Sequence, residues 1–220
     1  MSLFGKSIHI WIFLTHSVII ISMATPHLKQ ERTVVLVKPD GVKRGLVGEV
    51  ISRIERRGLK VISLSMIQAT REQADAHYPK DPLWITRLGE KSLSTYQKYG
   101  IDPTASVGTD DPEKIGAMVR GWLLDYFIEG PMVKIVVEGI HAVDMVRKLA
   151  GNTIPAFAEM GTLRGDFSVD SAALANAGKR AIRNIVHASE TSEEFAHEVQ
   201  LWFLPQEIHD YKRAEEDIMF

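Results

Sequence analysis

The feature that most constrains the fold is a short run of residues without any alternation of polar and apolar positions. Residues 33–37 read Thr-Val-Val-Leu-Val, and β-branched side chains of this kind favour strands. A strand without a polar face is typical of burial on both sides of a sheet. The run therefore predicts a central strand, and the Pro39-Asp40-Gly41 turn that follows marks its end.

Further strands and helices are indicated along the rest of the chain. Strands are expected at residues 59–67, 132–137 and 182–187, where apolar and β-branched residues concentrate. Helices are expected where apolar residues recur three and four positions apart, in segments 47–54, 71–78 and 142–150 and in the segment with Phe195, Val199 and Trp202. Thr191 and Glu194 have the spacing of a capping box at the start of that last helix.

The order of these elements, β-α-β-α-β-α-β-α, predicts an α+β fold. We expect a ferredoxin-like sandwich, in which a four-stranded antiparallel sheet is covered by helices. The helices are expected to be segregated to one side of the sheet. The charged segment from Asp210 to Phe220 is expected to be a surface tail.

Composition agrees with one globular domain that carries additional segments. The chain has 220 residues, of which 45% are hydrophobic and 25% are charged. The net charge is −2, so no general basic field indicates a nucleic-acid partner. Because the chain has no cysteine, disulfides and cysteine-based catalysis or metal sites are excluded, and the redox compartment stays undetermined.

Residues 1–30 form an N-terminal extension that differs from the rest of the chain. Residues 8–21 are mostly apolar, but they are too few, and too interrupted by histidine and serine, for a membrane span. Lys6 before this run and Ser22-Met23-Ala24 after it have the form of a signal peptide and its cleavage site. Alternatively, translation begins at Met23 and residues 1–22 do not belong to the protein.

The segment Asn184-Ile185-Val186-His187-Ala188-Ser189-Glu190 is the first candidate for chemistry. It places a histidine at the end of an apolar run with polar groups on both sides. Neutral imidazole is a competent nucleophile near pH 7. The chain has 8 histidines, however, so the case for His187 depends on the other motifs.

Three motifs together resemble the nucleoside diphosphate kinase family. They are Lys-Pro-Asp-Gly at residues 38–41, Gly-Thr-x-Arg-Gly-Asp-Phe at 161–167, and Asn-x-x-His-x-Ser at 184–189. They occur in the family's order, and the resemblance extends from about Glu31 to about Tyr211. It implies that residues 31–220 form one domain of this family, with insertions at about 84–116 and 170–180.

The resemblance implies a reaction and a set of site residues. Members of this family transfer the γ-phosphoryl group of ATP or another nucleoside triphosphate to a nucleoside diphosphate, by a ping-pong mechanism through a phosphohistidine. His187 matches the nucleophile, and Ser189 and Glu198 match the residues that support it. The positions that match nucleotide-binding residues of the family are Lys38, Tyr78, Arg147, Thr153, Arg164 and Asn184. Tyr78 matches a tyrosine that packs beside the catalytic histidine.

The resemblance is weakest where the family binds the nucleotide base. Family members clamp the base between a phenylalanine and a valine. Counting back from Tyr126 places Val119 at the phenylalanine's position, and the valine's counterpart falls within the insertion at 170–180. We therefore expect base stacking to be weaker, or arranged differently, in this chain.

The remaining expectations concern cofactor, partners and location. The chain lacks the P-loop pattern and a cluster of carboxylates, so no protein metal site is predicted, and Mg²⁺ is expected to arrive with the nucleotide. The resemblance implies a homo-oligomer, a hexamer or tetramer, in the cytoplasm. Export or membrane anchoring through residues 1–22 is the alternative location. The alternative functions are a non-catalytic binding relative and transfer of phosphate from histidine to another protein.

Overall fold

The computed structural model describes residues 31–219, so the expectations for residues 1–30 lie outside the described residues. Its strands are β1 (Glu31–Val37), β2 (Lys60–Ile67), β3 (Met132–Gly139) and β4 (Val186–Ala188). They form one sheet in the order β2-β3-β1-β4, and every neighbouring pair is antiparallel. The predicted four-stranded antiparallel sheet is therefore confirmed, with β1 inside it.

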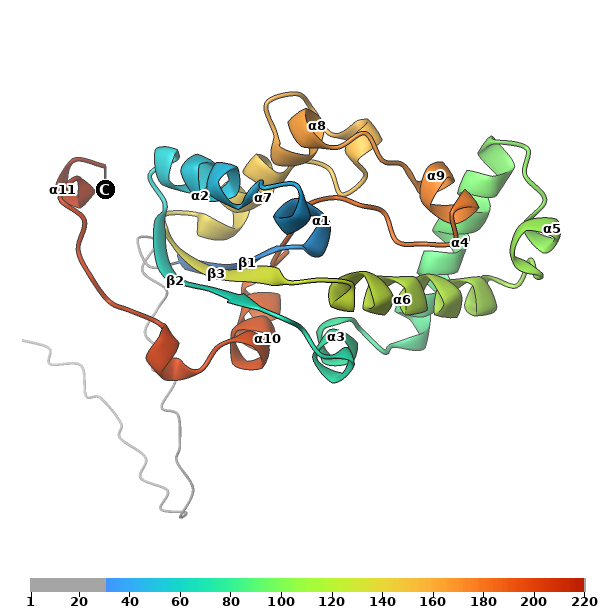
Figure 1. The fold of residues 1–220 in the computed structure, drawn as a ribbon, viewed down its shortest axis with the longest axis horizontal. Helices are drawn as coiled ribbons and strands as arrows, with labels where there is room; N and C mark the ends of the chain where they lie inside the picture. Colours follow the sequence, from blue (N-terminus) through green and yellow to red (C-terminus); the bar gives the residue numbers. More distant parts are fainter. Residues whose placement is uncertain (1–30, 220) are drawn as a thin grey trace, which may run out of the picture.

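Helices cover both faces of this sheet, so the expectation that they lie on one side is wrong (Figure 1). Val35 and Val37 of β1 pack into one core cluster, whereas Val34 and Leu36 pack into another on the opposite face. Successive side chains of a strand point to opposite faces, so an unbroken apolar run requires a cover on each. The run at residues 33–37 thus already indicated helices on two sides.

Each face has its own set of helices. The first cluster is covered by α1 (Pro39–Lys43), α2 (Val47–Arg56), α7 (Ala142–Ala150) and α8 (Leu163–Phe167), and the second by α3 (Arg71–His77), α6 (Pro112–Ile128) and α10 (Ser192–Trp202). The remaining helical segments are α4 (Pro82–Lys98), α5 (Pro103–Val107), η2 (Pro155–Phe157), α9 (Ala172–Ala177), η3 (Pro205–Glu207) and α11 (Glu216–Met219).

Strand β4 is shorter than the predicted strand at residues 182–187. Ile185 has a φ of +71°, in the left-handed region, so the extended backbone begins only at Val186. A positive φ is unfavourable for a β-branched residue and costs about 1–3 kcal/mol. The residue types at positions 182–187 favour a strand, but the backbone conformation of Ile185 interrupts it two residues before His187.

The N-terminus of α10 differs in one detail from the predicted capping box. The hydroxyl of Thr191 accepts a hydrogen bond from the backbone N–H of Glu194, as expected for an N-cap. The carboxylate of Glu194 accepts from the backbone N–H of Glu190 rather than from that of Thr191. The helix start is thus capped, and the segment after His187 is fastened to it.

Helices α4 and α6 form a long hairpin, and residues 84–116 run from within α4 to the start of α6. The two helices approach closely at glycines: a Cβ at Gly89 would lie 1.8 Å from the carbonyl oxygen of Pro112, and one at Gly116 would lie 1.9 Å from that of Ile85. Any larger residue would push the backbones apart. The arrangement of the hairpin therefore depends on these two positions.

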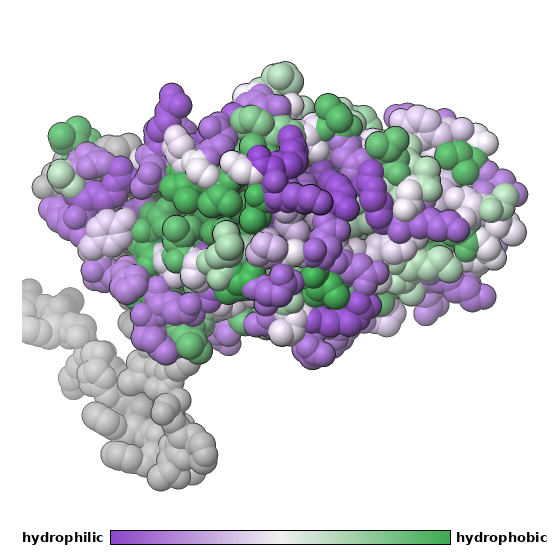
Figure 2. All heavy atoms as spheres, viewed as in Figure 1, coloured by the Kyte–Doolittle hydropathy of each residue, from purple (hydrophilic) through white to green (hydrophobic). Residues whose placement is uncertain are grey.

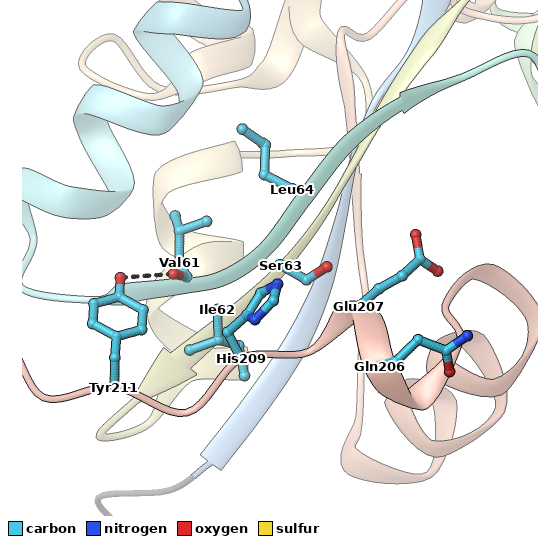
Figure 3. Close-up of a pocket in the computed structure, with 8 residues that line it drawn as sticks. All are labelled: Val61, Ile62, Ser63, Leu64, Gln206, Glu207, His209 and Tyr211. Carbon is cyan, nitrogen blue, oxygen red and sulfur yellow. Dashed lines mark hydrogen bonds between the residues drawn. The ribbon is translucent and has the colours of Figure 1, made fainter.

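The C-terminal segment lies on the surface, as expected, and it runs along the outer strand β2. The backbone N–H of His209 donates to the carbonyl of Ile62 at 2.9 Å, and the hydroxyl of Tyr211 donates to that of Val61 at 2.8 Å. Between this segment and β2 lies a pocket (Figure 3) of about 600 Å³, lined by Val61, Ile62, Ser63, Leu64, Gln206, Glu207, His209 and Tyr211. It lies at the edge of the sheet opposite to β4.

Apolar side chains are also exposed near this edge. On the face drawn in Figure 2, hydrophobic residues gather over the region where Figure 1 places β2 and α2. Leu64 and Met66 of β2 are 49% and 61% exposed. No helix among residues 31–219 is long and apolar enough to cross a membrane.

Candidate active site

His187 lies on β4 with its ring half-buried, and its neighbours come from β4 and α10. Its Nε2 lies 2.5 Å from Oε1 of Glu198, which is only 1% exposed. The other carboxylate oxygen of Glu198 accepts from the hydroxyl of Ser189 at 2.7 Å. The Ser189 hydroxyl in turn accepts from the backbone N–H of Val34 on β1. The carboxylate of Glu198 is therefore buried against His187 rather than exposed on the surface of α10.

This contact determines which ring nitrogen of His187 is nucleophilic. A carboxylate beside Nε2 favours a proton on that nitrogen, so Nδ1 keeps its lone pair. Burial, together with the cationic Lys38 and Arg164, lowers the pKa of His187 to about 3. Below that pKa the ring would be charged and its second nitrogen blocked. The ring therefore stays neutral, with a free electron pair, throughout the physiological pH range.

The ring that packs directly against His187 belongs to His77, which the sequence analysis did not identify. The two ring centroids are 4.5 Å apart in an edge-to-face arrangement. The indole N–H of Trp202 donates to Nδ1 of His77 at 3.3 Å, and burial holds the pKa of His77 well below its usual value. Tyr78, which is predicted to pack beside the catalytic ring, packs edge-on against His77. His77 and Ala74, three residues apart, are the buried positions of α3, a spacing visible in the sequence.

Ligand atoms of His77, His187 and Glu198 lie within 4.8 Å of one another, a grouping that raises the question of a metal ion. The 2.5 Å contact between His187 and Glu198 is that of a hydrogen bond, and the lone pair of His77 Nδ1 already accepts from Trp202. Mg²⁺ moreover prefers oxygen ligands in an octahedral arrangement with several waters. These three side chains therefore suit an orienting network better than a magnesium site.

Lys38 and Asn184 join the end of β1 to the segment before His187. The ammonium of Lys38 donates to Oδ1 of Asn184 at 2.8 Å, and the amide of Asn184 donates to the carbonyl of Thr153 at 2.9 Å. Lys38, Asn184 and Thr153, three of the predicted nucleotide-binding residues, are therefore linked by hydrogen bonds. Thr153 is exposed and takes part through its backbone carbonyl. Burial and the nearby Arg164 lower the pKa of Lys38 to about 7.

Arg164 is buried and donates to three backbone carbonyls. Its guanidinium reaches the carbonyls of Asn184, Gly151 and Val186 at 3.1, 2.7 and 2.7 Å. A guanidinium has five N–H groups, so two stay available for a phosphate. Burial and the neighbouring Arg147 lower its pKa to about 10.

Arg147 lies on α7 at the edge of the site. It is 42% exposed and forms an ion pair with Glu190, the residue three positions after His187, at 3.1 Å. Lys38, Arg164 and Arg147 thus place positive charge around His187, and this charge adds to burial in lowering the pKa of Lys38 and of Arg164. The negative charge of a polyphosphate would neutralise the positive charge of these three side chains.

The base-binding expectation stays a prediction. Val119 is half-buried on α6. Its neighbour Arg120 donates to the backbone carbonyls of Asp75, Tyr78 and Pro79, and so fastens α6 to the end of α3.

Comparison with known proteins agrees with the family resemblance of the three motifs. Residues 31–82 and 116–208 match the family model described as "Nucleoside diphosphate kinase". A nucleoside diphosphate kinase from Pyrobaculum aerophilum is 45% identical over 178 residues, covering 81% of this chain and 97% of that relative. One from Archaeoglobus fulgidus is 39% identical over 190 residues, covering 86% and 97%.

Solved structures give the same answer. The crystal structure of an NDP kinase from Pyrobaculum aerophilum matches with a TM-score of 0.79 and 43% identity, covering 82% of this chain and 100% of that one. A transition state mimic of nucleoside-diphosphate kinase from Borrelia burgdorferi, with bound vanadate and ADP, matches with a TM-score of 0.69 and 33% identity, covering 86% and 96%. On its motifs, its fold and these relatives, the chain belongs to the nucleoside diphosphate kinase family.

Proposed function

We propose that this protein is a nucleoside diphosphate kinase that works through a phosphohistidine at His187. The observation that carries the proposal is the asymmetry of the His187 ring: Nε2 is engaged by a buried carboxylate, and Nδ1 is left with its lone pair among cationic side chains. This arrangement suits attack on a phosphoryl group, because nucleophile and charge neutralisation are in one place.

Each half-reaction exchanges one bond for another. The Nδ1 lone pair forms a bond to the γ-phosphorus, the bond from that phosphorus to the bridging β-oxygen breaks, and the diphosphate leaves with the electron pair. The ring, still protonated at Nε2, becomes positively charged, and the carboxylate of Glu198 stabilises that charge. A β-phosphate oxygen of the second diphosphate then attacks the phosphohistidine, and the Nδ1 lone pair is restored.

The cationic residues hold the polyphosphate in line with His187. Lys38 and Arg164 would neutralise the phosphate oxygens, and Arg147 and the hydroxyl of Thr153 would complete the phosphate site. Asn184 and Tyr78 belong to the nucleotide-binding surface in this proposal. Enzymes of this family bind nucleotides together with a divalent cation. We assign Mg²⁺, carried by phosphate oxygens and water, since the nearby histidines do not suit it.

Assembly and location are part of the same proposal. A homo-oligomer, hexamer or tetramer, is supported by the exposed apolar side chains of Leu64 and Met66 on the outer strand β2. Sedimentation velocity on the purified chain tests this, and a monomer would contradict it. A cytoplasmic location suits an enzyme of the nucleotide pool, and cell fractionation tests it against export or anchoring through residues 1–22.

The deciding experiment is intact mass spectrometry after brief incubation with Mg·ATP alone, then after addition of a different nucleoside diphosphate. We expect a gain of one acid-labile phosphoryl group that the diphosphate removes, and no gain for His187→Ala. A folded wild-type protein that gains no phosphoryl group would instead be a binding protein. A phosphoenzyme that diphosphates cannot discharge would favour transfer to another protein.

A further inference from the structure

Asp40 is a buried carboxylate in the Lys-Pro-Asp-Gly motif, whose predicted turn is the first turn of helix α1, and none of the roles described above uses it. It is 5% exposed. Oδ1 accepts from the hydroxyl of Tyr126 at 2.5 Å, and Oδ2 accepts from the backbone N–H of Ile185 at 3.2 Å. Neither of these hydrogen bonds comes from a cationic side chain. The charges of Lys38 and Arg164 interact with this carboxylate, but its hydrogen bonds come from neutral groups. A buried carboxylate that is hydrogen-bonded by neutral donors is costly, so its role in the structure needs an explanation.

Its backbone partner Ile185 is the residue with φ of +71° that interrupts β4. Around it the N–H of Val186 donates to the carbonyl of Asn184 at 2.7 Å, which closes a three-residue turn of the strained kind. Such a conformation persists only where the surroundings over-determine it.

Those surroundings come from the Lys-Pro-Asp-Gly turn. The backbone N–H of Lys38 donates to the carbonyl of Ile185 at 2.8 Å, while Asp40 accepts from its N–H. Gly41 presses against the same residue, since a Cβ there would lie 3.0 Å from Ile185 Cγ2. Both polar groups of the strained residue are thus bound by one turn. The Tyr126 hydroxyl, bound to Asp40, also accepts from the N–H of Asn184 at 3.3 Å.

The strained turn separates two functional side chains. Asn184 precedes Ile185 and bonds to Lys38, and His187 follows two residues later. Relaxing Ile185 to an extended conformation would rotate one of these side chains relative to the other. We propose that Asp40 is a positioning residue, which holds Ile185 in its strained conformation so that the bound nucleotide and Nδ1 of His187 are aligned for phosphoryl transfer. This inference rests on the proposed function.

Graded variants separate alignment from nucleotide binding. Asp40→Asn keeps an acceptor for one of the two donors, whereas Asp40→Ala removes both. Tyr126→Phe removes the hydroxyl that donates to Asp40 and accepts from Asn184, and it leaves the hydrogen bond from Ile185 to Asp40 in place. Rapid-quench measurement of phosphoenzyme formation from saturating Mg·ATP gives the transfer rate. We expect it to fall by about tenfold in Asp40→Asn and by about a hundredfold in Asp40→Ala, since small misplacements have large effects on rate. Tyr126→Phe should lie between wild type and Asp40→Asn, with ATP affinity nearly unchanged in all three.

A second phosphoryl donor tests the nucleophile alone. Phosphoramidate is a small reagent that phosphorylates histidine without a nucleotide, so it needs no alignment with Asn184. If Asp40 positions the two groups, the Asp40 variants should react with phosphoramidate at the wild-type rate. Equal slowing with both donors would overturn the inference, because the damage would then be to His187 itself.

Asp170→Asn is the control at a second buried aspartate, which also forms an ion pair with Arg180. Asp170 is also buried and accepts from a backbone N–H, that of Arg183 at 2.7 Å, just ahead of the same segment. We expect it to change the melting temperature but not the transfer rate. If Asp40→Ala does not fold, the isosteric Asp40→Asn decides the question, with its fold checked by near-ultraviolet circular dichroism.

The outcomes are distinguishable from failure of the proposed function. If wild type accepts no phosphoryl group from Mg·ATP, the proposed function fails and the inference fails with it. If wild type accepts one and the folded Asp40 variants do so at the same rate, the inference alone fails. Weaker ATP binding at an unchanged maximal rate would also overturn it, since Asp40 would then act in binding.

Discussion

Two regions of this molecule are stabilised in contrasting ways. The junction, by which we mean residues 38–41 and 184–189 with the buried side chains bonded to them, is joined by hydrogen bonds between polar groups, as between Lys38 and Asn184. The hairpin, residues 82–128, is joined mainly by the close approach of α4 and α6 at Gly89 and Gly116. The junction lies within the segments that match the family model, and residues 83–115 of the hairpin lie outside them.

The two kinds of contact predict which property, reaction rate or stability, a substitution changes in each region. Hydrogen bonds at the junction fix the direction of individual side chains, so a change there should alter rate at nearly constant stability. Close packing in the hairpin fixes distances between backbones, so a change there should alter stability with little effect on rate. Substitutions of matched size in the two regions can break this contrast.

The largest effect on rate is expected from Glu198→Gln at the junction. Glutamine keeps a single acceptor oxygen, so it can accept from only one of His187 and Ser189, and it cannot stabilise the charge that develops on the phosphorylated ring. We expect phosphoenzyme formation to slow by about 10²–10³-fold, measured by rapid quench and intact mass. Because burial raises the pKa of Glu198, ionisation of this group opposes folding, and the neutral variant should melt no lower than wild type. A variant with normal rate and a lower melting temperature would reverse the contrast.

The largest effect on stability is expected from Gly116→Ala in the hairpin. The new Cβ would meet the backbone carbonyl of Ile85, which has no flexible end to move aside. We expect a loss of about 1–3 kcal/mol in the free energy of unfolding, measured by chemical denaturation, with transfer by the folded fraction unchanged. Gly121→Ala is the control on the same helix, since nothing lies within 4 Å of its Cβ position. It should stabilise α6 by about 0.5–1 kcal/mol, and equal effects of the two substitutions would contradict the packing argument.

Much of the junction could be predicted from the sequence, because most of its residues belong to short motifs that can be recognised one at a time. The four strands and their antiparallel pairing could also be predicted, from the order of strand and helix patterns along the chain. The interruption of β4 could not, because Ile185 is a residue type that favours strands and its positive φ is imposed by Asp40 and Lys38, about 145 residues earlier. Tertiary contacts here override local preference.

The functional neighbours that escaped prediction share one property. The local sequence indicates only a turn at Asp40 and gives His77 no role, because their partners are distant in sequence. The partner of Asp40 is 145 residues away, and that of His77 is 125 residues away. The closeness of α4 and α6 was equally hidden, because a glycine in a helix gives no sign of what faces it. Pairing between distant segments is the information that a single sequence lacks.

A moderate effect is expected from pH, and it separates the chemistry of Lys38 from that of His187. With its pKa near 7, Lys38 loses its charge in the free enzyme as pH rises above that value. We expect kcat/KM for Mg·ATP to fall by up to tenfold per pH unit above about pH 7. The kcat should stay level, because bound phosphate restores the charge. Lys38→Arg remains charged, so its kcat/KM should stay flat over the same range, whatever its absolute value. A wild-type kcat/KM that is level to about pH 9 would contradict the assignment.

The smallest effect is expected from Glu190→Gln, at the exposed rim of the junction. Glu190 pairs with Arg147, and both side chains are largely in solvent, where an ion pair contributes about 0–1 kcal/mol. A phosphate must compete with this carboxylate for Arg147, so its removal should strengthen nucleotide binding by no more than about fivefold. Calorimetric titration with ADP at about 0.02 M salt should detect the gain, and at about 0.5 M salt the gain should vanish through screening. A gain that persists at high salt, or a loss of affinity, would mean that Glu190 does more than pair with Arg147. In that case the exposed residue Glu190 would act in nucleotide binding as the buried residues of the junction do. The junction would then differ from the hairpin over a larger part of its surface than its buried residues alone imply.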